Sequence, residues 1–281
     1  MSKLALGLAA LGRPAYINVG HGRDLPDAYE PEALERRCHA VLDAAWARGI
    51  RWFDAARSYG RAEEFLASWL RGRTGVTVSS KWGYRYVADW KRDAERHEIK
   101  EHTLEALERQ LAESRALLGP WLSLYQIHSA TLESGVLQNA AVLDRLRALR
   151  DEGLAVGLSL SGPRQAETLE RALELRLFSA VQATWNLLEP SAGPMLLRAK
   201  EAGLTVIVKE ALANGRLAGM DAEALAAAMA QPFADVVLSG AATPEQLASN
   251  VRALQLDGTT SAVEPESPEQ YWKTRAALPW T

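Results

Sequence analysis

The chain has 281 residues, of which 48% are hydrophobic and 24% are charged, so it can bury a large core and lacks the composition of a disordered protein. Its 32 lysines and arginines against 35 aspartates and glutamates give a formal net charge of -3 and form no basic stripe, which argues against nucleic acid as a partner. The lone cysteine, the lack of any apolar run of about 20 residues and the lack of a convincing signal peptide predict a cytoplasmic protein without a membrane span.

Two kinds of apolar pattern alternate along the chain. Short apolar runs bounded by polar residues or glycine predict strands, and apolar residues spaced by three and four predict helices. The strands are predicted at residues 4–8, 50–53, 76–80, 122–127, 155–158, 180–183, 205–208 and 236–238. Helices between the earlier strands are predicted from apolar positions of this spacing: Leu34, Cys38, Val41 and Ala45; Phe65, Leu66 and Leu70; Leu104, Leu107, Leu111 and Leu118; Val142, Leu146 and Leu149.

Strands that alternate with helices pair in parallel through crossover connections, and eight such units can close into a (β/α)8 TIM barrel. The alternative is an open doubly wound sheet, which would lead us to expect a Gly-x-Gly-x-x-Gly turn after the first strand. Gly7 and Gly12 are too far apart for that turn. No linker or repeat divides the chain, so the sequence favours one α/β barrel domain over residues 1–281.

Ionisable residues follow three consecutive predicted strands. Asp54 follows the strand at 50–53, Lys81 follows the strand at 76–80, and His128 follows the strand at 122–127. Tyr59 lies in the loop just beyond Asp54. Because barrels of this kind build their active site at the C-terminal ends of the strands, we expect these four side chains to meet at the barrel mouth.

A phenol, an ammonium, a carboxylate and an imidazole together suit the reduction of a carbonyl group. Tyrosine has an ordinary pKa of about 10, and we expect the ammonium of Lys81 to lower it so that Tyr59 donates its proton more readily. Asp54 would hold Lys81 in place, and His128 would orient the substrate oxygen or share the donated proton. Hydride would come from a cofactor, because no side chain supplies it. A structural ion pair is the plain alternative for Asp54 and Lys81 taken alone.

The sequence resembles the aldo-keto reductase family. The segments that carry the resemblance occur in the family's order, and they are residues 54–60, 79–81, 125–128 and 240–247, followed by Asn250. The resemblance implies that Tyr59 is the general acid and base, that Lys81 and Asp54 tune it, and that His128 helps to place the carbonyl. It also implies a nicotinamide dinucleotide extended across the barrel mouth.

For the nicotinamide, the resemblance implies contacts from Ser159 and Gln182 to the carboxamide, while Leu160 replaces the family's asparagine. The family usually stacks an aromatic residue on the ring at the end of the seventh strand, where this chain has Lys209. Trp185, beside the neighbouring strand, is the predicted substitute.

For the rest of the dinucleotide, the resemblance implies a covering loop and a phosphate site after the last strand. The loop residues are Leu212, Gly215 and Leu217, and the later residues are Gly240, Thr243, Gln246 and Asn250. Residues 243–246 also predict a capped helix start whose free backbone N–H groups face an anion. The resemblance implies NADP(H), the family's usual cofactor. NAD(H) is the alternative, because no Arg or Lys stands at Ala242 or Gln246 to hold a 2′-phosphate.

Four residues are predicted to wall the substrate pocket, and a packing role is the alternative for each of them: Trp82, Tyr84, Tyr16 and Asn18. The remaining histidines lack metal-ligand spacing, so no metal is predicted. The expected substrate is a small carbonyl compound or alcohol. Two other functions stay open, a regulatory subunit that binds NADPH with little turnover and, less favoured, a metal-dependent barrel hydrolase.

Overall fold

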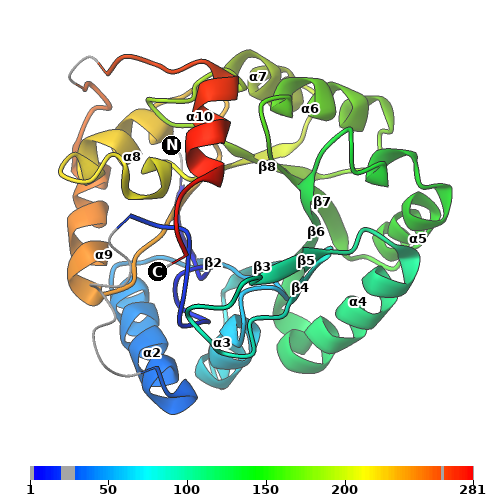
Figure 1. Ribbon diagram of the computed structural model, residues 1–281, viewed down its shortest axis with the longest axis horizontal. Coiled ribbons are helices and arrows are strands. Elements are labelled where there is room, and N and C mark those ends of the chain that lie inside the picture. Colours follow the sequence, from blue (N-terminus) through cyan, green and yellow to red (C-terminus); the bar gives the residue numbers. More distant parts are fainter. Residues whose placement is uncertain (1–2, 20–28, 261–262, 281) are drawn as a thin grey trace.

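The structure is a computed structural model that describes residues 3–19, 29–260 and 263–280. Eight parallel strands form a closed barrel in the spatial order β1, β10, β9, β8, β7, β6, β3, β2 (Figure 1). Their bounds are Lys3–Gly7 for β1, Trp52–Asp54 for β2, Thr77–Trp82 for β3, Leu122–Ala130 for β6, Ala155–Leu160 for β7, Ala180–Thr184 for β8, Thr205–Lys209 for β9 and Val236–Ser239 for β10. The predicted TIM barrel is therefore confirmed.

Helices surround the barrel and follow the strands in turn (Figure 1). Their bounds are Pro31–Ala47 for α2, Ala62–Leu70 for α3, Leu104–Leu118 for α4, Ala140–Asp151 for α5, Gln165–Glu174 for α6, Gly193–Glu201 for α7, Asp221–Met229 for α8 and Pro244–Val251 for α9. Short 3-10 turns occur at Gly119–Trp121, Val136–Gln138, Ala213–Gly215 and Arg252–Gln255. In the described part of the chain, no helix has the length and apolar character needed to cross a lipid bilayer.

The interior of the barrel is layered because alternate residues of each strand face inward. A separate buried hydrophobic cluster fills the part of the barrel that lies further from the mouth. It consists of Ala5, Leu124, Ala180, Ile207, Val236 and Leu238. Two residues further along three of these strands, the inward positions are polar: Gln126 follows Leu124, Gln182 follows Ala180 and Lys209 follows Ile207. The larger hydrophobic cluster packs the outward faces of the strands against the helices. This layering places a polar floor under the barrel mouth.

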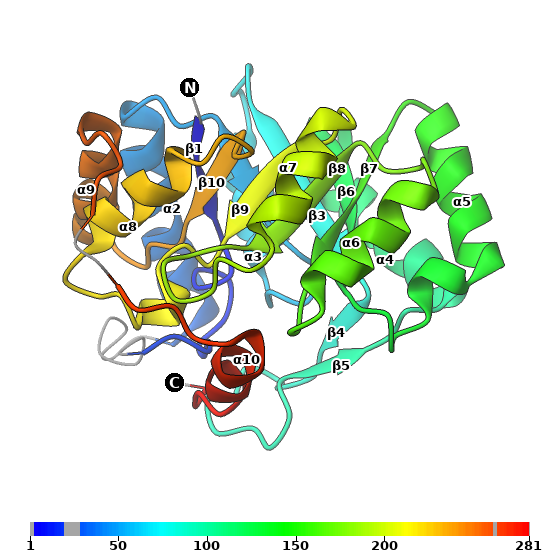
Figure 2. The same ribbon diagram turned by 90° about the horizontal axis from the view of Figure 1, so that it is seen from above.

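Two elements at the mouth were not predicted. An antiparallel hairpin joins β4 (Tyr84–Tyr86) to β5 (Glu98–Lys100), and helix α10 (Pro268–Ala276) lies in a C-terminal segment for which the sequence analysis predicted no helix. Figure 2 shows the hairpin and α10 at the same end of the barrel. Strand β6 also extends past the predicted end, so that His128 lies within the strand. These elements add walls to the mouth beyond those of the basic barrel.

Candidate active site

Asp54 is the centre of a buried polar network inside the barrel. Its side chain is only 2% exposed, and its Oδ2 lies 2.5 Å from the Nζ of Lys81. Its Oδ1 accepts hydrogen bonds from the Oγ of Ser79 at 2.7 Å and from the Nε2 of Gln182 at 3.2 Å. A buried carboxylate with this many donors is held in one orientation, and it in turn fixes the position of Lys81.

Tyr59 lies directly above this pair. Lys81 donates to the Tyr59 hydroxyl at 3.4 Å and to the carbonyl of Ala55 at 2.9 Å. The ring of Tyr59 meets the ring of His128 edge to face, with 5.5 Å between the ring centres. The structure thus brings together Asp54, Tyr59, Lys81 and His128, the four side chains that the sequence predicted to meet.

The pKa of Tyr59 differs from the prediction in its direction. Burial and the nearby Asp54 carboxylate raise the pKa of Tyr59 well above its usual value, and the Arg13 guanidinium offsets part of this rise. The predicted net lowering by Lys81 is not found, because burial and the Asp54 carboxylate, which lies 2.5 Å from the Nζ of Lys81, outweigh it. The phenol is therefore fully protonated near neutral pH, which is the form that can donate a proton.

His128 is held neutral. Burial lowers the pKa of His128 well below its usual value, and the cations of Lys81, Lys209 and Arg13 lower it further. Its Nδ1 lies 3.4 Å from the hydroxyl oxygen of Ser58. A neutral imidazole carries one N–H, so His128 can donate a single hydrogen bond to a substrate oxygen.

Arg13 is a site residue that the sequence analysis did not single out. Its side chain is 2% exposed, and its Nη1 donates to the carbonyl of Ser58 at 2.8 Å and to Glu98 at 2.6 Å. The guanidinium carbon lies 5.2 Å from the ring centre of Tyr59 and 4.8 Å from that of Trp280. Arg13 therefore ties the first loop, the hairpin and the C-terminal segment to the Tyr59 ring. The sequence signal that could have identified Arg13 was its place in the loop after the first predicted strand.

Two glycines let the first loop pack directly against the Tyr59 loop. A Cβ atom at Gly12 would lie 2.2 Å from the carbonyl oxygen of Tyr59, and one at Gly60 would lie 2.4 Å from the carbonyl oxygen of Gly12. Gly60 also has a φ of +60°. The Arg61 N–H donates to the Gly12 carbonyl at 2.7 Å. This contact positions Tyr59, and a larger residue at either glycine would clash with the backbone of the other loop.

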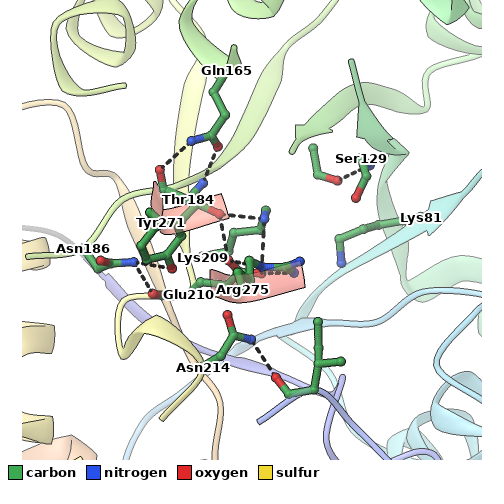
Figure 3. A network of polar contacts seen from close by, with 12 residues as sticks. Lys81, Ser129, Gln165, Thr184, Asn186, Lys209, Glu210, Asn214, Tyr271 and Arg275 are labelled. Atoms are coloured by element: carbon green, nitrogen blue, oxygen red, sulfur yellow. Dashed lines mark hydrogen bonds and ion pairs between the residues drawn. The ribbon is translucent and has the colours of Figure 1, made fainter. Parts of the chain in front are cut away.

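A second charged network lies at the end of β9. Arg275 of α10 binds the carboxylate of Glu210 through its Nε at 3.0 Å and its Nη2 at 2.5 Å. Lys209 donates to the hydroxyl of Thr184 at 2.8 Å and lies 3.5 Å from Glu210, as Figure 3 shows. Glu210 adopts a φ of +56°, a conformation that is costly for a side chain of this kind. The sequence analysis noted this position only because Lys209 replaces the aromatic residue that is usual in the family. It gave no sign of Arg275.

These groups surround a cavity of about 600 Å³ at the barrel mouth. Of the residues predicted to bind cofactor or substrate, ten line it: Ser159, Gln182, Leu212, Gly215, Gly240, Gln246, Asn250, Tyr16, Asn18 and Tyr84. Asn214 lines it as well, and its Oδ1 is buried without a hydrogen-bond donor. The cavity therefore runs from Tyr59 and His128 past the loop after β9 to α9.

Four of the residues predicted to bind cofactor or substrate do not line this cavity, and neither does the buried Lys81. Trp82 and Trp185 each follow an inward-facing residue, so strand alternation turns both indoles outward into the hydrophobic cluster between strands and helices. Trp185 packs there against Phe233, so it does not supply the predicted stacking surface. Leu217 packs in a cluster with Tyr271 and Trp272. Thr243 is the N-cap residue of α9, and its hydroxyl is used in that cap.

The start of α9 is less open to an anion than its sequence predicted. The Thr243 hydroxyl accepts from the N–H of Gln246 at 3.2 Å, and the Gln246 side chain accepts from the N–H of Ala242 at 2.8 Å. The predicted cap is confirmed, but these two N–H groups are already satisfied. Within the described ranges, no cluster of three or more histidine, cysteine or acidic side chains has the arrangement needed to hold a metal ion.

Comparison with known proteins decides the family. The model of the Aldo/keto reductase family matches residues 3–227 of the chain. The chain belongs to the aldo-keto reductase family. The uncharacterized oxidoreductase YqkF of Bacillus subtilis (strain 168) is 25% identical over 257 residues, covering 76% of this chain and 81% of YqkF.

Solved structures agree with the barrel. The crystal structure of PA4992 from Pseudomonas aeruginosa has a TM-score of 0.70 and 27% identity, and the match covers 90% of each chain. The holo form of the aldo-keto reductase AKR11C1 from Bacillus halodurans has a TM-score of 0.71 at 18% identity, covering 97% of this chain and 91% of that chain. At 18% identity, the likeness to AKR11C1 shows a shared fold and nothing further. As a member of this family, the chain is a nicotinamide-dependent oxidoreductase.

Proposed function

We propose that this aldo-keto reductase interconverts an aldehyde or ketone and the corresponding alcohol, with Tyr59 as the acid and base. The observation that carries the proposal is that the Tyr59 hydroxyl lies 3.4 Å from the Lys81 ammonium and beside the His128 ring, at the wall of the cavity in the barrel mouth. A reaction that adds hydride to carbon leaves charge on oxygen, and these groups are placed to neutralise it.

In the direction of reduction, the carbonyl oxygen accepts hydrogen bonds from the Tyr59 hydroxyl and the neutral His128 imidazole. As negative charge develops on that oxygen, Tyr59 transfers its proton to it. The negative charge left on the phenolate is offset by Arg13 and Lys81, which lie against the ring at 5.2 Å and 4.9 Å from its centre. In the direction of oxidation the same phenolate removes the alcohol proton.

A bound nicotinamide dinucleotide supplies or accepts the hydride. The residues present fit such a group. Ser159 and Gln182 offer a hydroxyl and an amide for the carboxamide, and the unpartnered Oδ1 of Asn214 offers an acceptor for a hydroxyl or amide donor. Leu212 and Gly215 would cover the pyrophosphate, and Gln246 and Asn250 would contact the far end.

Both NADP(H) and NAD(H) are candidates. Between β10 and the end of α9, the cavity is lined by Leu238, Gly240, Ala242, Gln246, Ser249 and Asn250. None of these six carries a positive charge, so a 2′-phosphate would find no strong electrostatic partner on this segment. We therefore expect only a modest preference between the two cofactors.

The test measures dissociation constants of NADPH and NADH by quenching of tryptophan fluorescence, followed by turnover of a panel of aldehydes and ketones with the tighter cofactor. Binding in the micromolar range with turnover of at least one carbonyl compound would support the proposal. Tight binding with no turnover across the panel would favour the regulatory-subunit alternative. Failure of both dinucleotides to bind would overturn the proposal.

A further inference from the structure

Lys209 is a buried cation that the proposed reaction does not use. It ends β9 and lines the same cavity as Tyr59 and His128, with a side chain that is 14% exposed. Its Nζ donates to the hydroxyl of Thr184 at 2.8 Å. Strand alternation directs it inward, because it lies two residues after Ile207 of the inner barrel cluster. A lysine held in this way projects a positive charge into the cavity.

The charge of Lys209 is only partly balanced. Glu210 lies 3.5 Å from its Nζ, but the same carboxylate also receives the guanidinium of Arg275. Two cations therefore share one anion. Lys81 of β3 adds a further positive field, and Asp221, which opens α8 at the cavity wall, forms no ion pair with Lys209 among the described residues.

These surroundings make the charge of Lys209 titratable near neutral pH. Burial, with a smaller contribution from the cations of Arg275 and Lys81, lowers the pKa of Lys209 to about 8 against the opposing effect of Glu210. Because the folded pKa lies near 8, the ammonium predominates at pH 7 and the neutral amine predominates at pH 9.5. The field of Lys209 also reaches the reaction centre, since it contributes to the lowered pKa of His128.

We propose that Lys209 makes this enzyme select the reduced over the oxidised dinucleotide. This inference rests on the proposed function. Hydride transfer requires the nicotinamide ring to contact the carbon whose oxygen meets Tyr59 and His128, so the ring must lie in the cavity that Lys209 lines. The oxidised ring carries a positive charge and the reduced ring carries none. An ammonium in this partly desolvated cavity therefore repels the oxidised form and leaves the reduced form unaffected.

The experiment measures four dissociation constants at pH 6.5 and pH 9.5, for NADPH, NADP+, NADH and NAD+. Fluorescence reports the reduced forms and calorimetry reports the oxidised forms, so no turnover is needed. Within each pair the phosphates are the same, and their own titration cancels in the ratio of oxidised to reduced dissociation constants. We expect this ratio to fall about tenfold in the wild-type protein as the pH rises through the pKa of Lys209.

Three variants isolate the charge. Lys209→Met should show the low ratio at both pH values, mainly through tighter binding of the oxidised form. Lys209→Arg keeps the charge and should show the high ratio at both pH values. Lys273→Met removes an equal charge from the exposed face of α10 and should behave like the wild type.

The outcomes separate this inference from the proposed function. If the dinucleotides bind but the wild-type ratio is the same at both pH values, the inference is overturned, and this result needs no variant to fold. A ratio in Lys209→Met equal to that of Lys209→Arg would also overturn it. If no dinucleotide binds the wild-type protein, it is the proposed function that fails.

Discussion

At the scale of single residues, the proposed reaction depends most on the hydroxyl of Tyr59. Tyr59→Phe removes it and keeps the ring that packs against Arg13 and His128. We expect kcat to fall by at least about 100-fold, because general acid catalysis is lost, while the dissociation constant for the dinucleotide changes by less than about threefold. Steady-state kinetics and fluorescence titration check this. A variant that retains most of its kcat would rule out Tyr59 as the acid.

His128 links the site to the stability of the fold. Its pKa lies well below the unfolded value of about 6.5, so below that pH the unfolded chain binds a proton that the folded chain does not. Stability from this source is present above pH 6.5 and is lost as the pH falls. At pH 5.5 we expect a loss of about 1.4 kcal/mol in the wild type that His128→Asn lacks. Urea unfolding at pH 7.5 and 5.5 measures it, and equal losses in both proteins would contradict the neutral His128.

At the scale of elements, α10 depends on the pairing of Arg275 with Glu210. Arg275→Met leaves a buried carboxylate with only Lys209 and Thr184 as partners, and we expect a cost of about 3 kcal/mol in the free energy of unfolding. The double variant Glu210→Gln with Arg275→Met should recover part of this cost, because no unpaired carboxylate remains, and the rest of the cost reflects the loss of the anionic partner of Lys209. Deuterium exchange across Pro268–Ala276 should also accelerate in the single variant. Exchange and stability equal to those of the wild type would show that the pair does not hold α10.

The elements differ in how well the sequence predicts them, and the reason is physical. Long periodic runs such as α4 follow from their spacing alone, and their bounds agree with the apolar pattern. The hairpin strands β4 and β5 have three residues each, too few to show an alternation. Helix α10 has only two buried residues, Tyr271 and Trp272, so its sequence reads as polar. Its position depends on contacts with a strand end some 65 residues away, such as that of Arg275 with Glu210.

The candidate site shows the same division. Asp54, Lys81 and His128 were predictable because parallel strands bring their ends to one place, whatever the details of packing. Trp82 was predicted at the cavity because it directly follows Lys81, and Trp185 because it lies beside the neighbouring strand. Consecutive strand residues face opposite ways, however, and both indoles pack outside the barrel. The direction of the Tyr59 pKa was not predictable, because it depends on how deeply the fold buries the phenol and how near it places the Asp54 carboxylate.

At the scale of the whole molecule, the cavity joins segments from both ends of the chain, including Arg13, Tyr59, Glu98, Glu210 and Trp280. A dinucleotide bound there is expected to stabilise the entire barrel, because it binds the folded chain and not the unfolded chain. At 100 times the dissociation constant the gain is about 2.7 kcal/mol, which corresponds to a rise in Tm of about 5 °C. Tyr59→Phe should show the same rise, since its missing hydroxyl serves the chemical step. Differential scanning fluorimetry with NADPH and NADH measures this, with ATP as the control for a nucleotide that lacks nicotinamide. A rise with ATP as large as that with NADPH or NADH would show that the nicotinamide half contributes nothing to binding.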